Sequence, residues 1–273
     1  MHLIELATEL LTVILRLAGQ KWEFPLCIAC TRLQAIVCRY GVGKKHTMAC
    51  EEFAHSVGFA TWARANTPPG TYIKQMSAVA AEKGSVPLLV WARDNGYPGD
   101  EFTCEIAAWH GHISVLKWAR ANGYKWNANT CAYCARNGHL AALQWARANG
   151  CPWNADTCKY AIKFGHLAVL KWARANGCQW AEHTFYLAAE NGHLPVLQWI
   201  FLQGYTLYSN ICAAAATNGH LHVIEWARAN DCPWDEDTCS CAAAYGHLEI
   251  LQWARRNGCP WDDQTCTDAA YEG

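Results

Sequence analysis

The chain has 273 residues and a formal net charge of −1, and 52% of its residues are apolar while 16% are charged. The apolar content excludes an intrinsically disordered chain, and the balanced charge argues against a general nucleic-acid binder, which needs an excess of Lys and Arg. The 16 cysteines are too small a share for a short secreted disulfide scaffold, which reaches about 8–10%.

Residues 1–46 form an N-terminal segment with helical spacing of its apolar residues, which are Leu3, Leu6, Leu10, Ile14 and Leu17. The segment lacks the basic start of a signal peptide, and no apolar stretch near it approaches the ~20 residues that span a bilayer. We therefore expect a cytoplasmic protein with free thiols and no membrane contact.

Two interpretations of this segment are open. It is a helical cap, because the first repeat of a stacked array must cover an open core. Alternatively, the stretch from Glu5 to Leu15, followed by Val37-Cys38-Arg39, resembles an F-box. That resemblance implies docking to a Skp1-type adaptor of a cullin ubiquitin ligase.

A cysteine and histidine group in the same segment has the residue types of a Cys₃His zinc site: Cys27, Cys30, Cys38 and His46. However, the neighbours Leu26, Ile28 and Ala29 are apolar, which favours a buried helix. We expect no metal and no cofactor.

From residue 47 onward the sequence repeats every 27 residues, with one longer unit at the start. A Gly-His pair recurs in six of the copies and a tryptophan in all eight, as in Gly111-His112 with Trp118 and Gly246-His247 with Trp253. A fixed period of this length indicates a stacked repeat architecture. Eight repeats begin at Thr47, Met76, Thr103, Thr130, Thr157, Thr184, Ile211 and Thr238, and half a repeat runs from Thr265 to Gly273.

Each repeat predicts two short helices. In the last full copy the first helix begins with the N-cap candidate Thr238 and ends before Gly246. The second helix runs from His247 to Asn257 and stops at Gly258. A Cys-Pro-Trp turn then leads to the next repeat.

The pattern Thr-x-x-x-Ala-Ala-x-x-Gly-His-Leu-x-x-Leu, followed by Asn-Gly, resembles the ankyrin repeat. These units are six residues shorter than the 33-residue ankyrin unit. The missing length falls where ankyrin repeats carry a β-hairpin finger. The Trp-Ala-Arg-x-Asn-Gly-Cys-Pro-Trp signature is similar to ankyrin-like arrays of large DNA viruses of protists and of some algae and oomycetes.

This resemblance covers residues 47–273. It implies an all-α, right-handed solenoid of helix-turn-helix repeats with reduced or absent β-hairpin fingers. If the chain is viral, its location is the host cytoplasm.

The tryptophans fall into two rows. One follows the Trp-Ala-Arg position of the second helices, as at Trp145, and the other lies in the turns, as at Trp153. An aromatic platform for bases, sugars or peptides is one interpretation. We expect core packing instead, with each tryptophan stacked on its copy in the next repeat. Because we recognise no basic row beside them, base stacking is not expected.

The cysteines of the repeats also form rows, at the helix starts and in the turns. Neighbouring helices lie about 8–10 Å apart, whereas a disulfide needs Cα atoms within about 4.4–6.8 Å. Disulfides between neighbouring copies are thus excluded, and we expect buried free thiols. The histidine after each glycine is expected to form turn hydrogen bonds. No catalytic constellation is present, so we do not expect an enzyme.

A variable face of the first helices is the predicted recognition surface. Positions four residues apart change chemistry between copies while the framework stays fixed, and such positions share one helical face. In the ankyrin family the first helices line the binding groove, so the resemblance points to the same face. The predicted partner-binding residues are Glu105, Trp109, His110, Arg136, Lys159, Lys163, Phe164, Tyr186, Glu190 and Tyr245.

The sequence thus predicts a non-catalytic protein-interaction scaffold, monomeric, that binds a protein partner and no nucleic acid. The alternative is an F-box-like substrate adaptor. At the other end, either the acidic half repeat, with Asp268 and Glu272, serves as a polar cap or the chain is truncated at Gly273.

Overall fold

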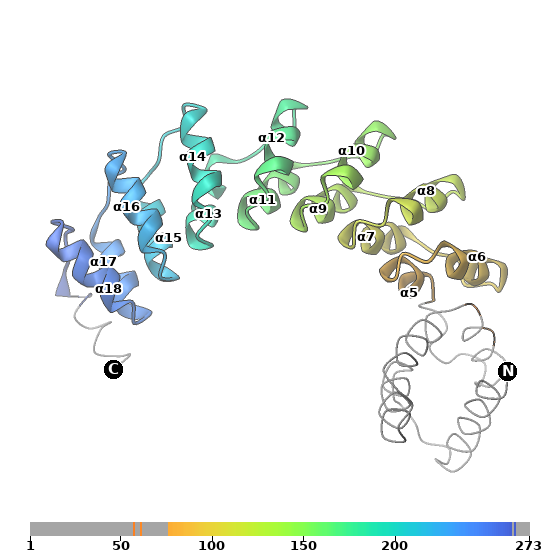
Figure 1. Cartoon of the computed structure of the whole chain (residues 1–273), viewed down its shortest axis with the longest axis horizontal. Helices are drawn as coiled ribbons and strands as arrows, with labels where there is room; N and C mark the ends of the chain where they lie inside the picture. Colours follow the sequence, from red (N-terminus) through yellow and green to blue (C-terminus); the bar gives the residue numbers. More distant parts are fainter. Residues whose placement is uncertain (1–56, 58–60, 62–75, 264, 266–273) are drawn as a thin grey trace, which may run out of the picture. The chain divides into compact units, whose positions relative to one another are not determined.

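The computed structural model describes residues 76–263 together with Val57, Thr61 and Thr265. Within these residues the chain forms fourteen α-helices and one 3-10 helix, and no strand. Figure 1 shows the helices in chain order. The N-terminal segment, with its cap, F-box and zinc interpretations, lies outside the described residues, as does nearly all of the C-terminal half repeat.

The helices alternate between a first and a second helix of each repeat. The first helices are α5 (Met76–Glu82), α7 (Glu101–Trp109), α9 (Ala128–Arg136), α11 (Ala155–Lys163), α13 (Tyr186–Glu190), α15 (Asn210–Thr217) and α17 (Glu236–Ala244). The second helices are α6 (Val86–Asp94), α8 (Ile113–Ala121), α10 (Leu140–Ala148), α12 (Leu167–Ala175), α14 (Leu194–Leu202), α16 (Leu221–Ala229) and α18 (Leu248–Arg256). The 3-10 helix, Glu182–Thr184, precedes α13.

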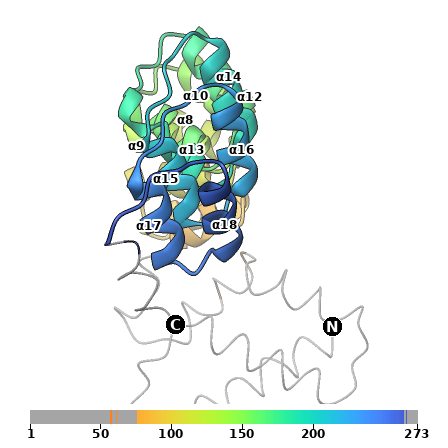
Figure 2. The same cartoon turned by 90° about the vertical axis from the view of Figure 1, so that its left-hand side faces the viewer.

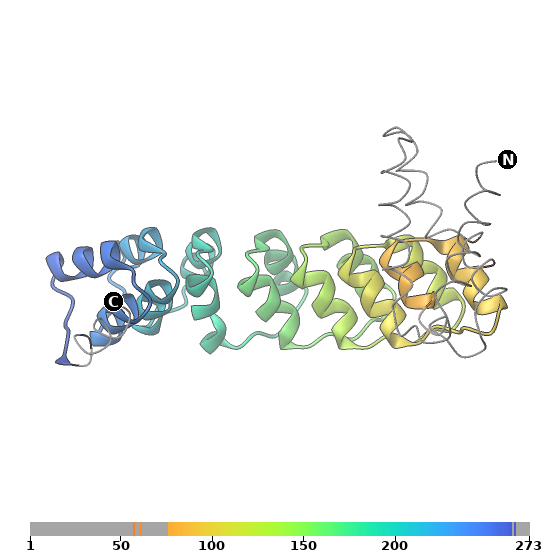
Figure 3. The ribbon, with the colours of Figure 1, turned by 90° about the horizontal axis from the view of Figure 1, so that it is seen from below.

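The chain divides into two compact units, residues 1–103 with 117–124 and residues 104–116 with 125–273. In the first unit α5 packs on α6. In the second unit, each first helix from α9 to α17 packs on the second helix of its own repeat and on the first helix of a neighbouring repeat. Figure 2 shows α9, α15 and α17 on one side and α12, α16 and α18 on the other, and Figure 3 shows the pairs following one another from green to blue. The predicted all-α stack of helix pairs is confirmed for the described residues.

The first helices begin earlier than the sequence predicts. Asn127 and Asn154 are the N-caps of α9 and α11, and their side chains accept bonds from the backbone N–H groups two residues ahead. Thr238, predicted as the N-cap, lies inside α17, and its counterpart Thr130 lies inside α9; both are fully buried. The prediction is wrong because Asn outranks Thr as an N-cap, while the methyl group of Thr fits the core.

A histidine and a glycine connect successive repeats. The ring of His166 occupies the space where a Cβ on Gly138 would lie, with Nδ1 at 2.7 Å from that point. Its Nε2 is 2.9 Å from the carbonyl oxygen of Arg136 in the preceding repeat. A carbonyl only accepts, so Nε2 carries the proton and donates it. The predicted hydrogen-bonding role is confirmed, but the bond crosses between repeats.

The cysteines of the described residues are free, and ten of these eleven are buried, as predicted. The prediction missed pairs within one repeat. The thiols of Cys158 and Cys178 are hydrogen-bonded, and this bond together with burial raises the pKa of Cys158. Cys178 Sγ also donates to the carbonyl of Asn154 at 3.5 Å. Cys178 therefore links the turn of its own repeat to the turn of the preceding repeat.

Candidate functional site: an aromatic and arginine cluster

Three successive first helices of the second unit bring five side chains together. The guanidinium of Arg136 on α9 lies 4.6 Å from the ring centroid of Trp109 on α7 and 4.8 Å from that of Phe164, the C-cap of α11. The same guanidinium lies 5.7 Å from the ring centroid of Tyr160 on α11. The fifth member, Tyr133, meets Trp109 edge to face at 5.4 Å. We call these five residues the aromatic–arginine cluster.

The backbone beneath this cluster is fixed by the next repeat. His139 Nε2 bonds to the carbonyl of Trp109 at 3.0 Å, and His166 Nε2 bonds to that of Arg136. The histidine that follows the glycine in one repeat therefore fixes the end of the first helix in the preceding repeat, where Trp109 and Arg136 lie. A side chain on a fixed backbone loses less entropy when a partner binds.

The charge of the cluster is uncompensated. No described carboxylate forms an ion pair with Arg136, and Lys159 and Lys163 on the neighbouring α11 are also without one. A guanidinium within about 6 Å of aromatic rings is held by cation–π attraction and keeps its N–H donors for other groups. The arrangement suits a partner that presents a carboxylate beside an apolar group.

Glu105 differs from the other predicted contact residues. Only 6% of it is exposed, and its Oε1 accepts hydrogen bonds from Asn127 Nδ2 at 2.8 Å and Asn129 Nδ2 at 3.2 Å. These bonds join α7 to the start of α9. The carboxylate is occupied within the protein, so we leave Glu105 out of the proposed contact surface.

The other predicted residues lie at the surface of the first helices or just after them. Lys159, Lys163, Tyr186 and Glu190 are half-buried, while His110 and Tyr245 are exposed. The structure brings Trp109, Arg136 and Phe164 together and places Tyr245 at the end of α17, three repeats from α11.

Sequence reasoning missed Tyr133 and Tyr160, which complete the cluster. Both occupy the same phase of their repeats, three or four residues before Arg136 and Phe164. Side chains at this spacing meet on one helical face. An aromatic residue followed at that spacing by a cation or a second ring was the available signal.

The tryptophan and arginine rows of the second helices pack differently from the prediction. Trp145 meets the edge of the turn residue Trp126 at 5.9 Å, and Trp172 meets Trp153 at 5.9 Å. The predicted stacking of each tryptophan on its own copy is therefore wrong among the described rings. The arginine of Trp-Ala-Arg, as at Arg147, lies over the turn ring Trp153. A basic row beside the tryptophans is thus present, contrary to expectation.

The described residues contain no group of three or more His, Cys, Asp or Glu side chains arranged to hold a metal. Among the helices described, none combines the length and the apolar content that a membrane crossing requires.

No family model matches the sequence, and neither does any curated protein. Among solved structures, the human ASB11 ankyrin repeat domain has 16% identity and a TM-score of 0.49, over 57% of this chain and 84% of that chain. The pentatricopeptide repeat protein PPR10, solved with an 18-nt psaJ RNA element, has 17% identity and a TM-score of 0.44 over 96% of this chain. This chain covers 45% of PPR10, less than half its length. Likeness at this level decides neither the family nor the ligand.

Proposed function

We propose that the protein is a non-catalytic, ankyrin-like scaffold that binds a protein partner through the first helices. The observation that carries the proposal is the aromatic–arginine cluster, where Arg136 lies near the rings of Trp109, Tyr160 and Phe164 and no carboxylate of the described residues pairs with it. Trp, Tyr and Arg are the residues that dominate binding energy at protein interfaces.

The neighbouring side chains support the same choice of surface. Lys159 and Lys163 lie on α11, which also carries part of the cluster, and Tyr186 and Glu190 lie on α13, the next first helix. The proposed partner surface is therefore apolar with acidic groups. We propose that the protein is a monomer. We propose the cytoplasm as its location, because the many thiols without a disulfide persist in a reducing compartment.

The test is affinity capture from cell extract with the full chain, followed by binding measurements on the purified partner. Arg136→Gln removes the central cation and is expected to weaken partner binding roughly tenfold or more, the usual effect at an interface hot spot. Arg256→Gln is the matched control, because Arg256 is exposed at the end of α18.

Trp109→Ala provides a second, uncharged probe of the same surface. We expect it to lose the same partners as Arg136→Gln. The proposal fails if both variants keep the wild-type melting temperature and still capture every partner with unchanged affinity.

A further inference from the structure

The second helices and turns carry a repeated arginine–tryptophan stack. The guanidinium of Arg147 lies 4.2 Å from the ring centroid of Trp153, and that of Arg174 lies 4.4 Å from Trp180. Arg174 Nη1 also donates to the carbonyl of Cys178 at 2.7 Å, and Arg147 makes the equivalent bond to Cys151. A ring and a carbonyl thus fix each guanidinium before any ligand arrives.

A cleft opens beside each of these stacks, and we call the two the indole clefts. The first has a volume of about 270 Å³ and the second, one repeat further, about 300 Å³. Each is lined by an arginine, by the tryptophan of its turn and by the tryptophan of the next second helix, and polar side chains stand at the edge. The first contains Gln144, Arg147, Trp153, Trp172 and Asn176, and the second Lys171, Arg174, Trp180, Trp199 and Gln203.

The charge of this face is positive. In the second unit, α10, α12, α14, α16 and α18 together carry six Lys or Arg and two Glu residues. No carboxylate of the described residues pairs with Arg147 or Arg174. The indole clefts therefore offer guanidinium groups to an anionic ligand.

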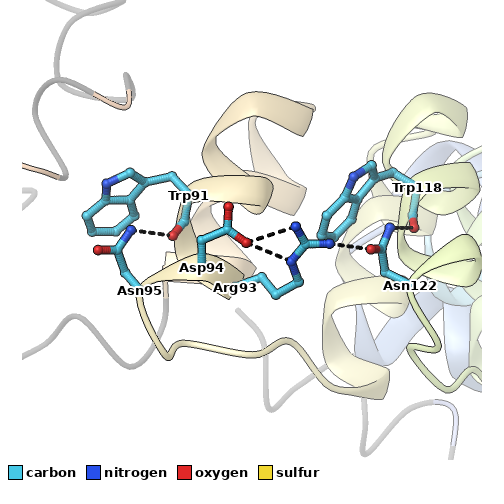
Figure 4. A network of polar contacts seen from close by, with 6 residues as sticks. All are labelled: Trp91, Arg93, Asp94, Asn95, Trp118 and Asn122. Atoms are coloured by element: carbon cyan, nitrogen blue, oxygen red, sulfur yellow. Dashed lines mark hydrogen bonds and ion pairs between the residues drawn. The ribbon is translucent and has the colours of Figure 1, made fainter.

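Arg93 in the first unit shows the contrasting, neutralised case (Figure 4). Its Nη2 donates to Asp94 Oδ1 at 2.8 Å, its Nη1 donates to Asn122, and its guanidinium lies over Trp118. The carboxylate of Asp94 neutralises the charge that Arg147 and Arg174 leave available.

We infer that the two indole clefts bind an extended, acidic, proline-containing segment of another protein, with one carboxylate beside each arginine. Proline rings pack on tryptophan in grooves that recognise polyproline II segments. A carboxylate accepts two N–H bonds from a guanidinium. Asn176 Nδ2 bonds to the carbonyl of Trp172 at 2.8 Å, which leaves the amide oxygen to accept from the backbone of the peptide.

The spacing of the clefts favours this ligand. A polyproline II segment presents the same face every three residues, which is about 9 Å of length. Packed helices of neighbouring repeats lie about 8–10 Å apart. An acidic residue at every third position therefore meets one arginine per repeat.

The length of the site follows from a break in the rows. In the next repeat Phe201 stands at the arginine position and Leu207 at the turn tryptophan position. The run of clefts therefore ends at the second one in this direction, and the two clefts together accept about six residues of polyproline II peptide.

A carboxylate ligand fits better than a nucleic acid. Phosphates follow one another at every nucleotide, and their binding requires many cations along the strand. Here one guanidinium per repeat lies among indole rings, in a chain whose net charge is −1. Single-stranded nucleic acid is therefore the competing ligand in the test.

The test measures fluorescence anisotropy of labelled ligands with the full-length protein. The ligands are a synthetic peptide of repeated Glu-Pro-Pro, its Lys-Pro-Pro counterpart and a single-stranded oligouridylate. We expect binding of the Glu-Pro-Pro peptide alone, with a Kd that rises with salt because the contacts are ionic. Tighter binding of oligouridylate, or equal binding of the Lys-Pro-Pro peptide, would overturn the inference.

Two sets of variants locate the binding. Arg147→Gln combined with Arg174→Gln is expected to raise the Kd about fivefold or more, the effect of losing two partly exposed ion pairs. Lys83→Gln combined with Arg256→Gln removes the same charge at exposed positions outside the clefts and the aromatic–arginine cluster, and should leave the Kd within about twofold. If the two pairs weaken binding equally, the attraction is general and the clefts are not the site.

A further pair of substitutions preserves the arginine–tryptophan stacks. Gln144 and Lys171 are exposed at the cleft edges, so Gln144→Glu with Lys171→Glu adds negative charge without disturbing the fold. Binding of the Glu-Pro-Pro peptide should be lost while the melting temperature stays unchanged. Unchanged peptide binding would contradict the inference, and partner capture through the aromatic–arginine cluster would be unaffected.

Discussion

The left-handed glycines of the described residues are of two kinds. Gly165 has φ +75° and a virtual Cβ only 2.6 Å from Nδ1 of His193. Gly177 has φ +82° and no neighbour within 4 Å of such a Cβ. At Gly177 only the backbone conformation requires glycine, whereas at Gly165 the packing between repeats requires it as well.

This difference predicts unequal costs of alanine. Gly177→Ala should lower the free energy of unfolding by about 1 kcal/mol, the usual strain of a left-handed non-glycine residue. Gly165→Ala should cost about 2–3 kcal/mol, because the methyl group also displaces the histidine ring. Urea denaturation of the two variants measures the difference, and equal costs would show that the ring moves away freely.

Between elements, the histidine bond couples the start of one second helix to the end of the preceding first helix. Burial is the main cause that lowers the pKa of His193. Its hydrogen bond to the backbone of Lys163 raises this pKa in part, and repulsion from His166 and His220 lowers it further. The pKa of His220 is also lowered, and burial is again the main cause. Protonation of these rings therefore opposes the packing between repeats.

The sign of the pH effect follows from that lowered pKa. Between the unfolded pKa, about 6.5, and the lower folded pKa, the unfolded state binds more protons. The contribution of these histidines is thus complete above about pH 6.5 and is lost as pH falls toward the folded pKa. His193→Gln, which keeps an N–H donor, should reduce the loss of unfolding free energy between pH 8 and pH 5. His183→Gln, at an exposed position, is the control and should leave the pH profile unchanged.

The helices were predictable because the same start and stop signals recur from one repeat to the next. The predicted second helix, His247 to Asn257, agrees with α18, which has those two residues as its caps. The N-cap was missed because Thr130 carries a side chain suitable for both roles, and only the structure shows it buried. The position of this threonine in the repeat does not distinguish an N-cap residue from a buried residue of the first helical turn.

The contacts of the candidate site were harder to predict, because they join residues about 27 apart. Trp109, Arg136 and Phe164 were named from their variability, but their common contact depends on helix rotation and side-chain direction. Tyr133 and Tyr160 were missed for that reason. Glu105 shares the variability of a surface residue, yet its carboxylate is buried under two asparagine side chains.

At the scale of the molecule, stability is distributed over contacts between neighbouring helices. The packed pairs α9 with α11, α13 with α15 and α15 with α17 each join adjacent repeats. In such a stack the free energy is close to a sum of repeat and interface contributions. A whole repeat can therefore be removed more safely than part of one.

Deletion of residues 157–183 removes one complete period and joins Asp156 to Thr184. We expect a folded protein with a lower melting temperature and an unchanged helical circular dichroism signal per residue. Deletion of residues 157–170 removes most of α11 and half of α12. That variant should lose its cooperative thermal transition, because unpaired apolar faces remain. Cooperative melting of both variants would contradict the conclusion that stability is a sum of repeats and their interfaces with adjacent repeats.

The fit of each histidine beneath the glycine of the preceding repeat also affects how such a gene changes over generations. Five junctions between the described repeats have this same glycine and histidine pair, so a repeat gained or lost there by unequal recombination meets a compatible neighbour at both ends. The array can therefore gain or lose whole repeats without creating an interface between repeats that do not fit. New combinations of recognition residues arise in this way before any point mutation is needed.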